Sequence, residues 1–170
     1  QPEPQPDGAL FAAAIPLRVA DAEGLVWEAP SAIVPADLDG DGRLDLLFCG
    51  ALDEGKANAV LQQTNTDGAF RLVPNHPLSK VPGVAAMVAD LDHSGSREVA
   101  FVSSEGVQVW QASGDQFAPV DDEALKNTLA SRSIQASDVD HDGDLDLLTE
   151  SGLLTANGDG SWRKQVDGLE

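Results

Sequence analysis

The sequence is poor in several residue types, and each shortage excludes a class of structure or partner. One cysteine and one methionine occur among the 170 residues, and tyrosine is absent. A lone thiol cannot form a disulfide within the chain, and Cys49 lies in an apolar run, which indicates a core residue rather than a nucleophile. Lysine and arginine number 10 against 29 aspartates and glutamates, for a formal net charge of −19. Since nucleic acids and anionic membrane surfaces are themselves negative, this charge argues against both as partners and favours cations.

Long apolar runs are also missing. No stretch of about 18 apolar residues is present, and no charged-then-apolar signal begins the chain, so insertion into a membrane is not expected. Residues 1–9 are rich in proline and polar side chains and predict a linker. With 42% apolar residues the chain has enough material for a core, and we assign residues 10–170 to one folded segment.

Much of the negative charge lies in a stretch that occurs three times. DLDGDGRLD spans residues 37–45, DLDHSGSRE residues 90–98 and DVDHDGDLD residues 138–146, a period of about 50 residues. A run of small apolar residues precedes each stretch and a hydrophobic run follows it, and both are typical of buried strands. Each repeat then continues with another strand-like run, a turn with Gly, Asn or Asp, and an aromatic residue: Phe70, Phe117 or Trp162.

The repeats predict an all-β fold. Each repeat, at about residues 31–83, 84–132 and 133–168, reads as four strands, and a four-stranded unit at this period is typical of a β-propeller blade. PDGALFAAAIPL, residues 6–17, is similar to the end of a repeat and predicts an extra outer strand. DDEALKNTLAS, residues 121–131, predicts a short helix or turn between the second and third repeats. We therefore expect about three four-stranded antiparallel blades plus an extra N-terminal strand, a partial propeller.

The acidic stretches favour a hard divalent cation. Two carboxylates about 4 Å apart repel each other by roughly 4 kcal/mol near a protein surface. Ca²⁺ removes this repulsion and accepts six to eight oxygens, and no cluster of His and Cys favours a softer metal. Counting the first Asp as position 1, we expect side-chain ligands at positions 1, 3, 5 and 9, a carbonyl ligand at position 7 and a glycine at position 6 for the sharp turn. The predicted ligands are Asp37, Asp39, Asp41, Asp45 and the carbonyl of Arg43 in the first loop, and Asp138, Asp140, Asp142, Asp146 and the carbonyl of Asp144 in the third.

The second loop differs in two of these positions. Its predicted ligands are Asp90, Asp92, Ser94, Glu98 and the carbonyl of Ser96. Serine at position 5 removes one charge and glutamate at position 9 has a longer arm, so two strong Ca²⁺ sites and one weaker site are predicted. An EF-hand is excluded, because position 12 holds Phe48, Phe101 or Thr149 instead of a bidentate glutamate and the flanks are of β type.

The pattern D-x-D-x-D-G-x-x-D between two hydrophobic strands resembles FG-GAP/VCBS repeats, which occur in integrin α-subunit propellers and in many secreted bacterial proteins. The resemblance covers residues from about 10 to 168, and LLTANGDGSW is similar to the bacterial form. It implies calcium-stabilised blades, an extracytoplasmic location (secreted, periplasmic or at the cell surface), and adhesion to or recognition of a protein or glycan. Such propellers usually have about seven blades, so further blades from the same or another chain are expected to complete this one.

A second function stays open: a purely structural accessory subunit or domain of a larger secreted or envelope complex. That further blades belong to an enzyme also stays open, although this segment itself is expected not to be one. Its paired carboxylates lie in metal-type loops rather than in a glycosidase arrangement, and the histidines show no triad spacing. His93 and His141, at position 4, are expected to face solvent. Trp110 and Trp162 lie in strand-like runs and are expected in the core, which leaves Trp27 as the candidate recognition residue.

Overall fold

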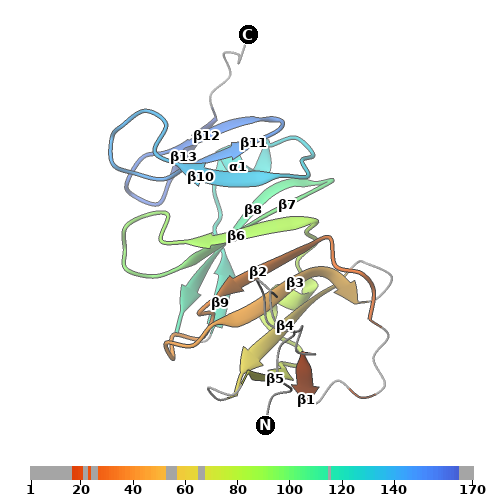
Figure 1. The fold of residues 1–170 in the computed structure, drawn as a ribbon. Coiled ribbons are helices and arrows are strands. Elements are labelled where there is room, and N and C mark those ends of the chain that lie inside the picture. Colours follow the sequence, from red (N-terminus) through yellow and green to blue (C-terminus); the bar gives the residue numbers. More distant parts are fainter. Residues whose placement is uncertain are drawn as a thin grey trace, which may run out of the picture.

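The computed structural model describes residues 17–20, 23, 27–52, 57–64, 68–114 and 116–164, and these residues form three sheets (Figure 1). The first sheet has the order β1-β5-β4-β3-β2, and in the second and third sheets the strands follow one another in sequence order. The prediction of an all-β fold with three four-stranded blades and one extra strand is confirmed. The strands are β1 (Arg18–Ala20), β2 (Ala32–Ala36), β3 (Asp45–Leu52), β4 (Ala57–Gln63), β5 (Ala69–Leu72), β6 (Ala85–Ala89), β7 (Glu98–Ser103), β8 (Gly106–Ser113), β9 (Gln116–Pro119), β10 (Ile134–Ser137), β11 (Asp146–Thr149), β12 (Gly152–Ala156) and β13 (Trp162–Lys164).

The extra strand that the structure describes, β1, directly follows the segment for which a strand is predicted. β1 pairs with β5 in parallel, with Val19 opposite Phe70, and it occupies the edge of the sheet opposite to β2. The similarity of residues 6–17 to the end of a repeat carries no information about this parallel direction. Residues 6–16 of that segment and the predicted linker at 1–9 lie outside the described residues.

The middle sheet holds the stack together. Every residue of β7 is buried, because its side chains point alternately to two different neighbours. On one face Phe101 packs in a cluster with Leu47 of the first sheet, and on the other Val102 packs in a cluster with Leu147 of the third. A strand buried on both faces reads as a continuous apolar run, which explains the sequence EVAFVS.

Two short helices connect the blades. α1 (Glu123–Lys126) lies between the second and third sheets, as predicted, and Asp122 caps it by accepting hydrogen bonds from the N–H groups of Ala124 and Leu125. A 3₁₀ helix, η1 (Pro77–Lys80), lies between the first and second sheets and was not apparent from the sequence. The buried Asn58 of β4 holds η1 by donating to the carbonyls of Leu78 and Val81. No helix in the described part of the chain is long and apolar enough to cross a membrane.

The residues predicted for the core are found in it or at its margin. Cys49 is fully buried between the first two sheets, and Trp162 is buried in the cluster between the second and third. Trp110 is half-buried and packs against the cluster between the first two sheets. Trp27 is 37% exposed, and its ring meets Phe48 edge-on with 6.1 Å between the centroids.

Candidate metal centres

The three acidic loops occupy the same place in each sheet, between its first and second antiparallel strands. Residues 37–44 join β2 to β3, residues 90–97 join β6 to β7, and residues 138–145 join β10 to β11. Neighbouring loops also touch each other. A guanidinium nitrogen of Arg97 in the second loop lies 3.2 Å from the carbonyl oxygen of Leu38 in the first. Nδ1 of His93 in the second loop lies 2.9 Å from Oδ1 of Asp144 in the third.

The loops share a backbone shape with two left-handed residues. Position 6 has positive φ in all three loops, as the predicted role of the glycine there requires. Position 4 has positive φ as well, and there the second and third loops carry histidine, a residue that tolerates this conformation better than most. Both histidines are exposed, as expected. The residues concerned are Gly40, His93 and His141 at position 4, and Gly42, Gly95 and Gly143 at position 6.

Hydrogen bonds from backbone N–H groups to side-chain oxygens fix the turn. One oxygen of the position 1 aspartate accepts from the N–H of the position 6 glycine in every loop, at 3.0, 3.1 and 3.2 Å. The side chain at position 5 accepts from the N–H of position 7, where Arg43, Ser96 and Asp144 stand. These bonds orient the position 7 peptide. That its carbonyl binds a metal stays a prediction.

Position 9 is the buried anchor of each loop. Asp45, Glu98 and Asp146 are 0%, 3% and 0% exposed and begin β3, β7 and β11. Each accepts a hydrogen bond from the N–H of position 2, at 3.0, 2.8 and 2.8 Å. Burial raises the pKa of both Asp45 and Glu98, because a buried carboxylate loses its hydration.

The third strand of the sheet also contacts position 9, but not in every blade. The N–H groups of Gln63 and Ala156 donate to Asp45 and Asp146, each at 3.0 Å. In the second blade the longer arm of Glu98 changes this arrangement, and the N–H of Ala112 donates instead to the carbonyl of Arg97, at 2.9 Å.

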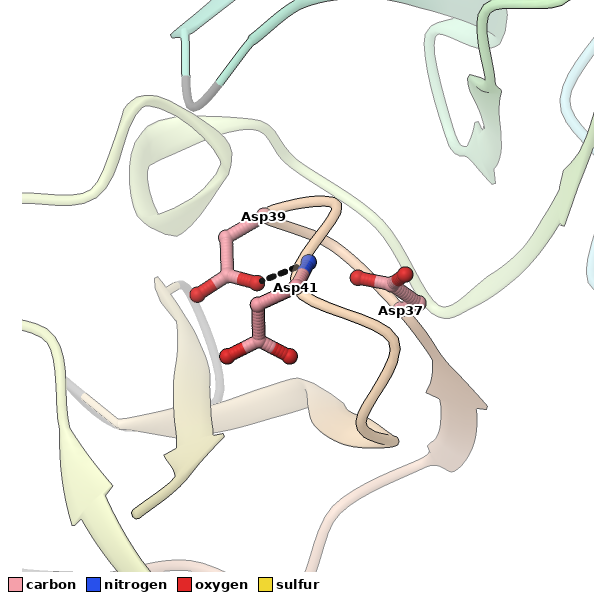
Figure 2. A group of neighbouring side chains, drawn as sticks. All are labelled: Asp37, Asp39 and Asp41. Carbon is pink, nitrogen blue, oxygen red and sulfur yellow. Dashed lines mark hydrogen bonds between the residues drawn. The ribbon is translucent and has the colours of Figure 1, made fainter.

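Carboxylates from each loop converge. In three groups of three residues, one oxygen per residue lies within 4.8 Å of the others. Figure 2 shows the first group, with three side chains that reach in from one turn of the chain. The groups are Asp37, Asp39 and Asp41; Asp90, Asp92 and Glu98; and Asp138, Asp140 and Asp146. The structure thus brings together nine of the eleven acids that are predicted as side-chain ligands, whereas Asp45 and Asp142 lie outside these groups.

The sequence pattern of these loops matches a known repeat family. The profile of the FG-GAP-like repeat matches residues 37–101 and 90–149, which include all three acidic loops. The chain belongs to the FG-GAP-like repeat family. Repeats of this family are of a non-catalytic type and occur in adhesion and recognition proteins that are typically extracellular. No curated protein sequence matches the chain.

The donor sets of the FG-GAP loops fit a cation such as Ca²⁺, which the family often binds. All the side chains in the three groups are carboxylates, the ligands that hard divalent cations prefer. Three buried oxygens in the second and third loops, Asp90 Oδ1, Glu98 Oε1 and Asp138 Oδ1, accept no hydrogen bond from the residues that the structure describes. A buried carboxylate oxygen without a donor is costly, and coordination to a cation removes this cost.

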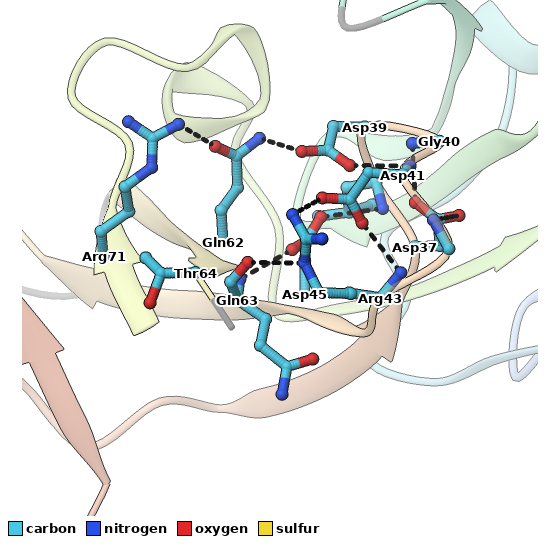
Figure 3. A network of polar contacts seen from close by, with 12 residues as sticks. Asp37, Asp39, Gly40, Asp41, Arg43, Asp45, Gln62, Gln63, Thr64 and Arg71 are labelled. Atoms are coloured by element: carbon cyan, nitrogen blue, oxygen red, sulfur yellow. Dashed lines mark hydrogen bonds and ion pairs between the residues drawn. The ribbon is translucent and has the colours of Figure 1, made fainter. Parts of the chain in front are cut away.

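The carboxylate oxygens of the first FG-GAP loop, in contrast to those of the second and third, all have hydrogen-bond donors within the protein (Figure 3). Each oxygen of its four aspartates accepts a hydrogen bond, from the N–H groups of Leu38, Gly40, Asp41, Gly42, Arg43 and Gln63 and from the side chains of Arg43 and Gln62. Arg43 also forms an ion pair with Asp41. The carboxylates that converge here are therefore held by the protein itself.

Side chains other than the predicted ligands also contact the loops, and the spacing of the acids does not predict them. Gln62 of β4 and Gln111 of β8 each donate to an aspartate at position 3. Arg97, at position 8 of the second loop, reaches the first loop. The repeat alignment contains a weak signal, since a glutamine occurs in both LQQ and VWQ at the end of a strand-like run. Nothing in the spacing of the acids reveals that contact.

Proposed function

We propose that the chain is a non-enzymatic, calcium-binding segment of a β-propeller, with one Ca²⁺ in each acidic loop. The observation that carries this is the convergence of three carboxylates in every loop, joined in the second and third loops by buried oxygens that accept no hydrogen bond within the described residues. When bound, the cation neutralises the clustered carboxylates and links the start of the loop to the anchor at position 9. It thereby stabilises the connection between the first two strands of a blade.

The proposed ligands are the residues that the spacing predicts, including the carbonyl oxygens at position 7. Four carboxylates in the first and third loops and three in the second favour two strong sites and one weaker site. The hydrogen bonds instead indicate that the second loop depends most on a cation, because it has two of the three unsatisfied buried oxygens among the described residues. Unfolding and hydrogen exchange in chelator separate these two effects.

We propose further that the assembled propeller recognises a protein or a glycan outside the cytoplasm. Three blades do not close a ring, and we infer that further blades, from the same or another chain, complete it. Trp27 is the candidate contact residue, because its amphipathic ring is partly exposed beside Phe48. A glycan array probed with the Ca²⁺-loaded protein tests this, with Trp27→Ala as the comparison. Binding that Trp27→Ala leaves unchanged would contradict the role of this ring.

Calcium dependence of the melting temperature tests the central proposal. A ligand present at 100 times its Kd stabilises the folded state by about 2.7 kcal/mol per site. We expect the melting temperature to rise by several degrees on passing from chelator to excess Ca²⁺. Asp39→Ala and Asp140→Ala should reduce the rise, whereas Asp121→Ala, which removes an exposed acid outside the loops, should not. Identical melting curves in chelator and in excess Ca²⁺ would overturn the proposal.

A further inference from the structure

We infer that Gln62 and Gln111 are positioning residues, which hold the position 3 aspartate of their own blade ready for the cation. The inference rests on the proposed cation binding. Nε2 of Gln62 lies 2.9 Å from Oδ2 of Asp39, and Nε2 of Gln111 lies 3.0 Å from Oδ2 of Asp92. Each glutamine lies on the third strand of its blade, outside the loop whose carboxylate it holds.

The two glutamines are equivalent in the sheets. Gln111 lies directly opposite Glu98, the anchor of the second loop. The pairing of Leu61 with Leu46 likewise places Gln62 opposite Asp45, the anchor of the first. The same contact therefore occurs at the same register position in two blades.

Each position 3 carboxylate is held from two sides. While Oδ2 accepts from the glutamine, Oδ1 accepts from the backbone N–H of position 5, at 3.1 Å from Asp41 and 3.0 Å from Ser94. An ionised carboxylate has about four lone-pair sites, so further sites remain for a cation. Partners that fix a ligand in this way commonly change metal affinity 10- to 100-fold when they are removed.

In the first blade a third residue orients the amide. Arg71 donates to Oε1 of Gln62 at 2.8 Å, so the NH₂ group of Gln62 is the end that faces Asp39 (Figure 3). These contacts link Arg71 of β5 through Gln62 of β4 to Asp39 in the loop. In the second blade Ala118 lies opposite Gln111 and supplies no such side-chain donor.

The second loop carries an independent sign of a ligand. Glu98 is 3% exposed and belongs to the group with Asp90 and Asp92, and its buried Oε1 accepts no hydrogen bond from the described part of the chain. Gln111 therefore acts on a cluster that has its own requirement for positive charge. The second blade is the better place to test the inference.

The third blade is a natural comparison because it lacks the glutamine. The strand register places Thr155 opposite Asp146, where the other two blades have glutamine. The hydroxyl of Thr155 donates to the carbonyl of Arg163 at 3.3 Å rather than to the loop. Asp140, at position 3, is exposed. Changes at Gln62 or Gln111 should leave the third loop unaffected.

A site-resolved titration tests the inference. The position 6 glycines give one backbone amide signal per loop, so ¹⁵N-labelled protein titrated with Ca²⁺ reports three midpoints, at Gly42, Gly95 and Gly143. Gln111→Met removes the donor and keeps the side-chain length. We expect it to raise the midpoint at Gly95 about ten-fold and to leave the midpoint at Gly143 unchanged. Gln62→Met should do the same at Gly42.

Matched variants separate positioning from folding. Gln63→Met is the control in the first blade, since Gln63 contacts Asp45 through its backbone N–H, and it should behave like the wild type. The melting temperature of Gln111→Met in chelator should equal that of the wild type. In an Asp92→Asn background, Gln111→Met should add no further loss.

The outcomes distinguish the two proposals. If Gln111→Met titrates like the wild type at Gly95 while Asp92→Asn does not, the positioning role is overturned and calcium binding survives. If the wild type shows no saturable shift at any of the three glycines, the proposed calcium binding itself fails.

Discussion

The first and second acidic loops have the same backbone shape but differ in how many of their carboxylate oxygens accept a hydrogen bond. Every carboxylate oxygen of the first loop accepts a hydrogen bond, whereas Asp90 Oδ1 and Glu98 Oε1 of the second are buried and accept none from the residues described. The first loop has more acids, yet the second has more unsatisfied oxygens. The number of carboxylates and the dependence on a cation are therefore separate properties.

Two arginines strengthen the contrast. Arg43 pairs with Asp41, and the guanidinium group of Arg97 lies so close to the first loop that a Cβ at Gly40 would be 3.0 Å from it. Fixed positive charges next to clustered carboxylates reduce their mutual repulsion. We therefore expect the first loop to keep its shape in chelator and the second loop to open.

The largest effect is expected from removing the position 9 anchors. Asp45→Ala leaves the N–H groups of Leu38 and Gln63 without their acceptor, so in chelator it should lower the free energy of unfolding by about 3 kcal/mol. Glu98→Ala removes one such bond together with a buried unsatisfied oxygen, so in chelator it should cost about 1 kcal/mol or less. Urea unfolding with and without Ca²⁺ measures both. Equal costs for the two variants in chelator would contradict the comparison.

Hydrogen exchange should separate the two loops in the unmodified protein. The N–H groups of Leu38 and Leu91 are equivalent, since each donates to the anchor of its own loop. Chelation should lower the protection of Leu91 about ten-fold, which corresponds to a local opening about 1.4 kcal/mol easier, and should leave Leu38 unchanged. Loss of protection at Leu38 alone would reverse the assignment.

A smaller effect concerns pH in the presence of chelator. Burial raises the pKa of Glu98 in the folded protein, so between its ordinary pKa and the raised one the folded state binds more protons than the unfolded state. Its contribution to stability therefore grows as the pH falls through this window and is lost as the pH rises through it. Glu98→Gln cannot ionise and should show a smaller gain between neutral pH and about pH 4.5 in urea unfolding. Equal pH slopes for wild type and variant would contradict this.

The smallest effect is expected at Arg97. Arg97→Met removes a fixed positive charge beside the first loop, and because water screens this partly exposed charge, the gain in Ca²⁺ affinity there should be about two- to three-fold. The midpoint at Gly42 in the glycine titration measures it, with Arg132→Met as a control for the change in net charge. A weaker first site in Arg97→Met would mean that the bond to Leu38 matters more than the charge.

The fold was largely predictable because consecutive strands of each blade pair with each other, so that a repeat in sequence is also a unit in space. The parallel pairing of β1 with β5 and the helix η1 were not predictable in this way. The pairing of β1 depends on a strand about 50 residues further along the chain. The helix η1 is held by the side chain of Asn58, and no repeated sequence pattern marks this residue.

For the site, spacing was sufficient to place the acids but not to rank the loops. Ligand positions within one short loop follow from local geometry, and nine of the predicted side chains do converge. The partners of those side chains come from β4, β8 and the neighbouring loop, and they depend on strand register and blade stacking. Asp45 illustrates the limit, because its spacing predicts a metal ligand but does not reveal that its carboxylate accepts hydrogen bonds from the N–H groups of Leu38 and Gln63.

The contacts between neighbouring loops give the array a fixed order. Arg97, which reaches back to the first loop, and His93, which reaches forward to the third, both belong to the second repeat. At the position of Arg97 the first and third loops carry Leu44 and Leu145, which cannot donate a hydrogen bond to a carbonyl. The three repeats are thus not interchangeable copies, and a permuted gene that placed the second repeat first or last among the three would leave one of these two side chains without a neighbouring loop to reach.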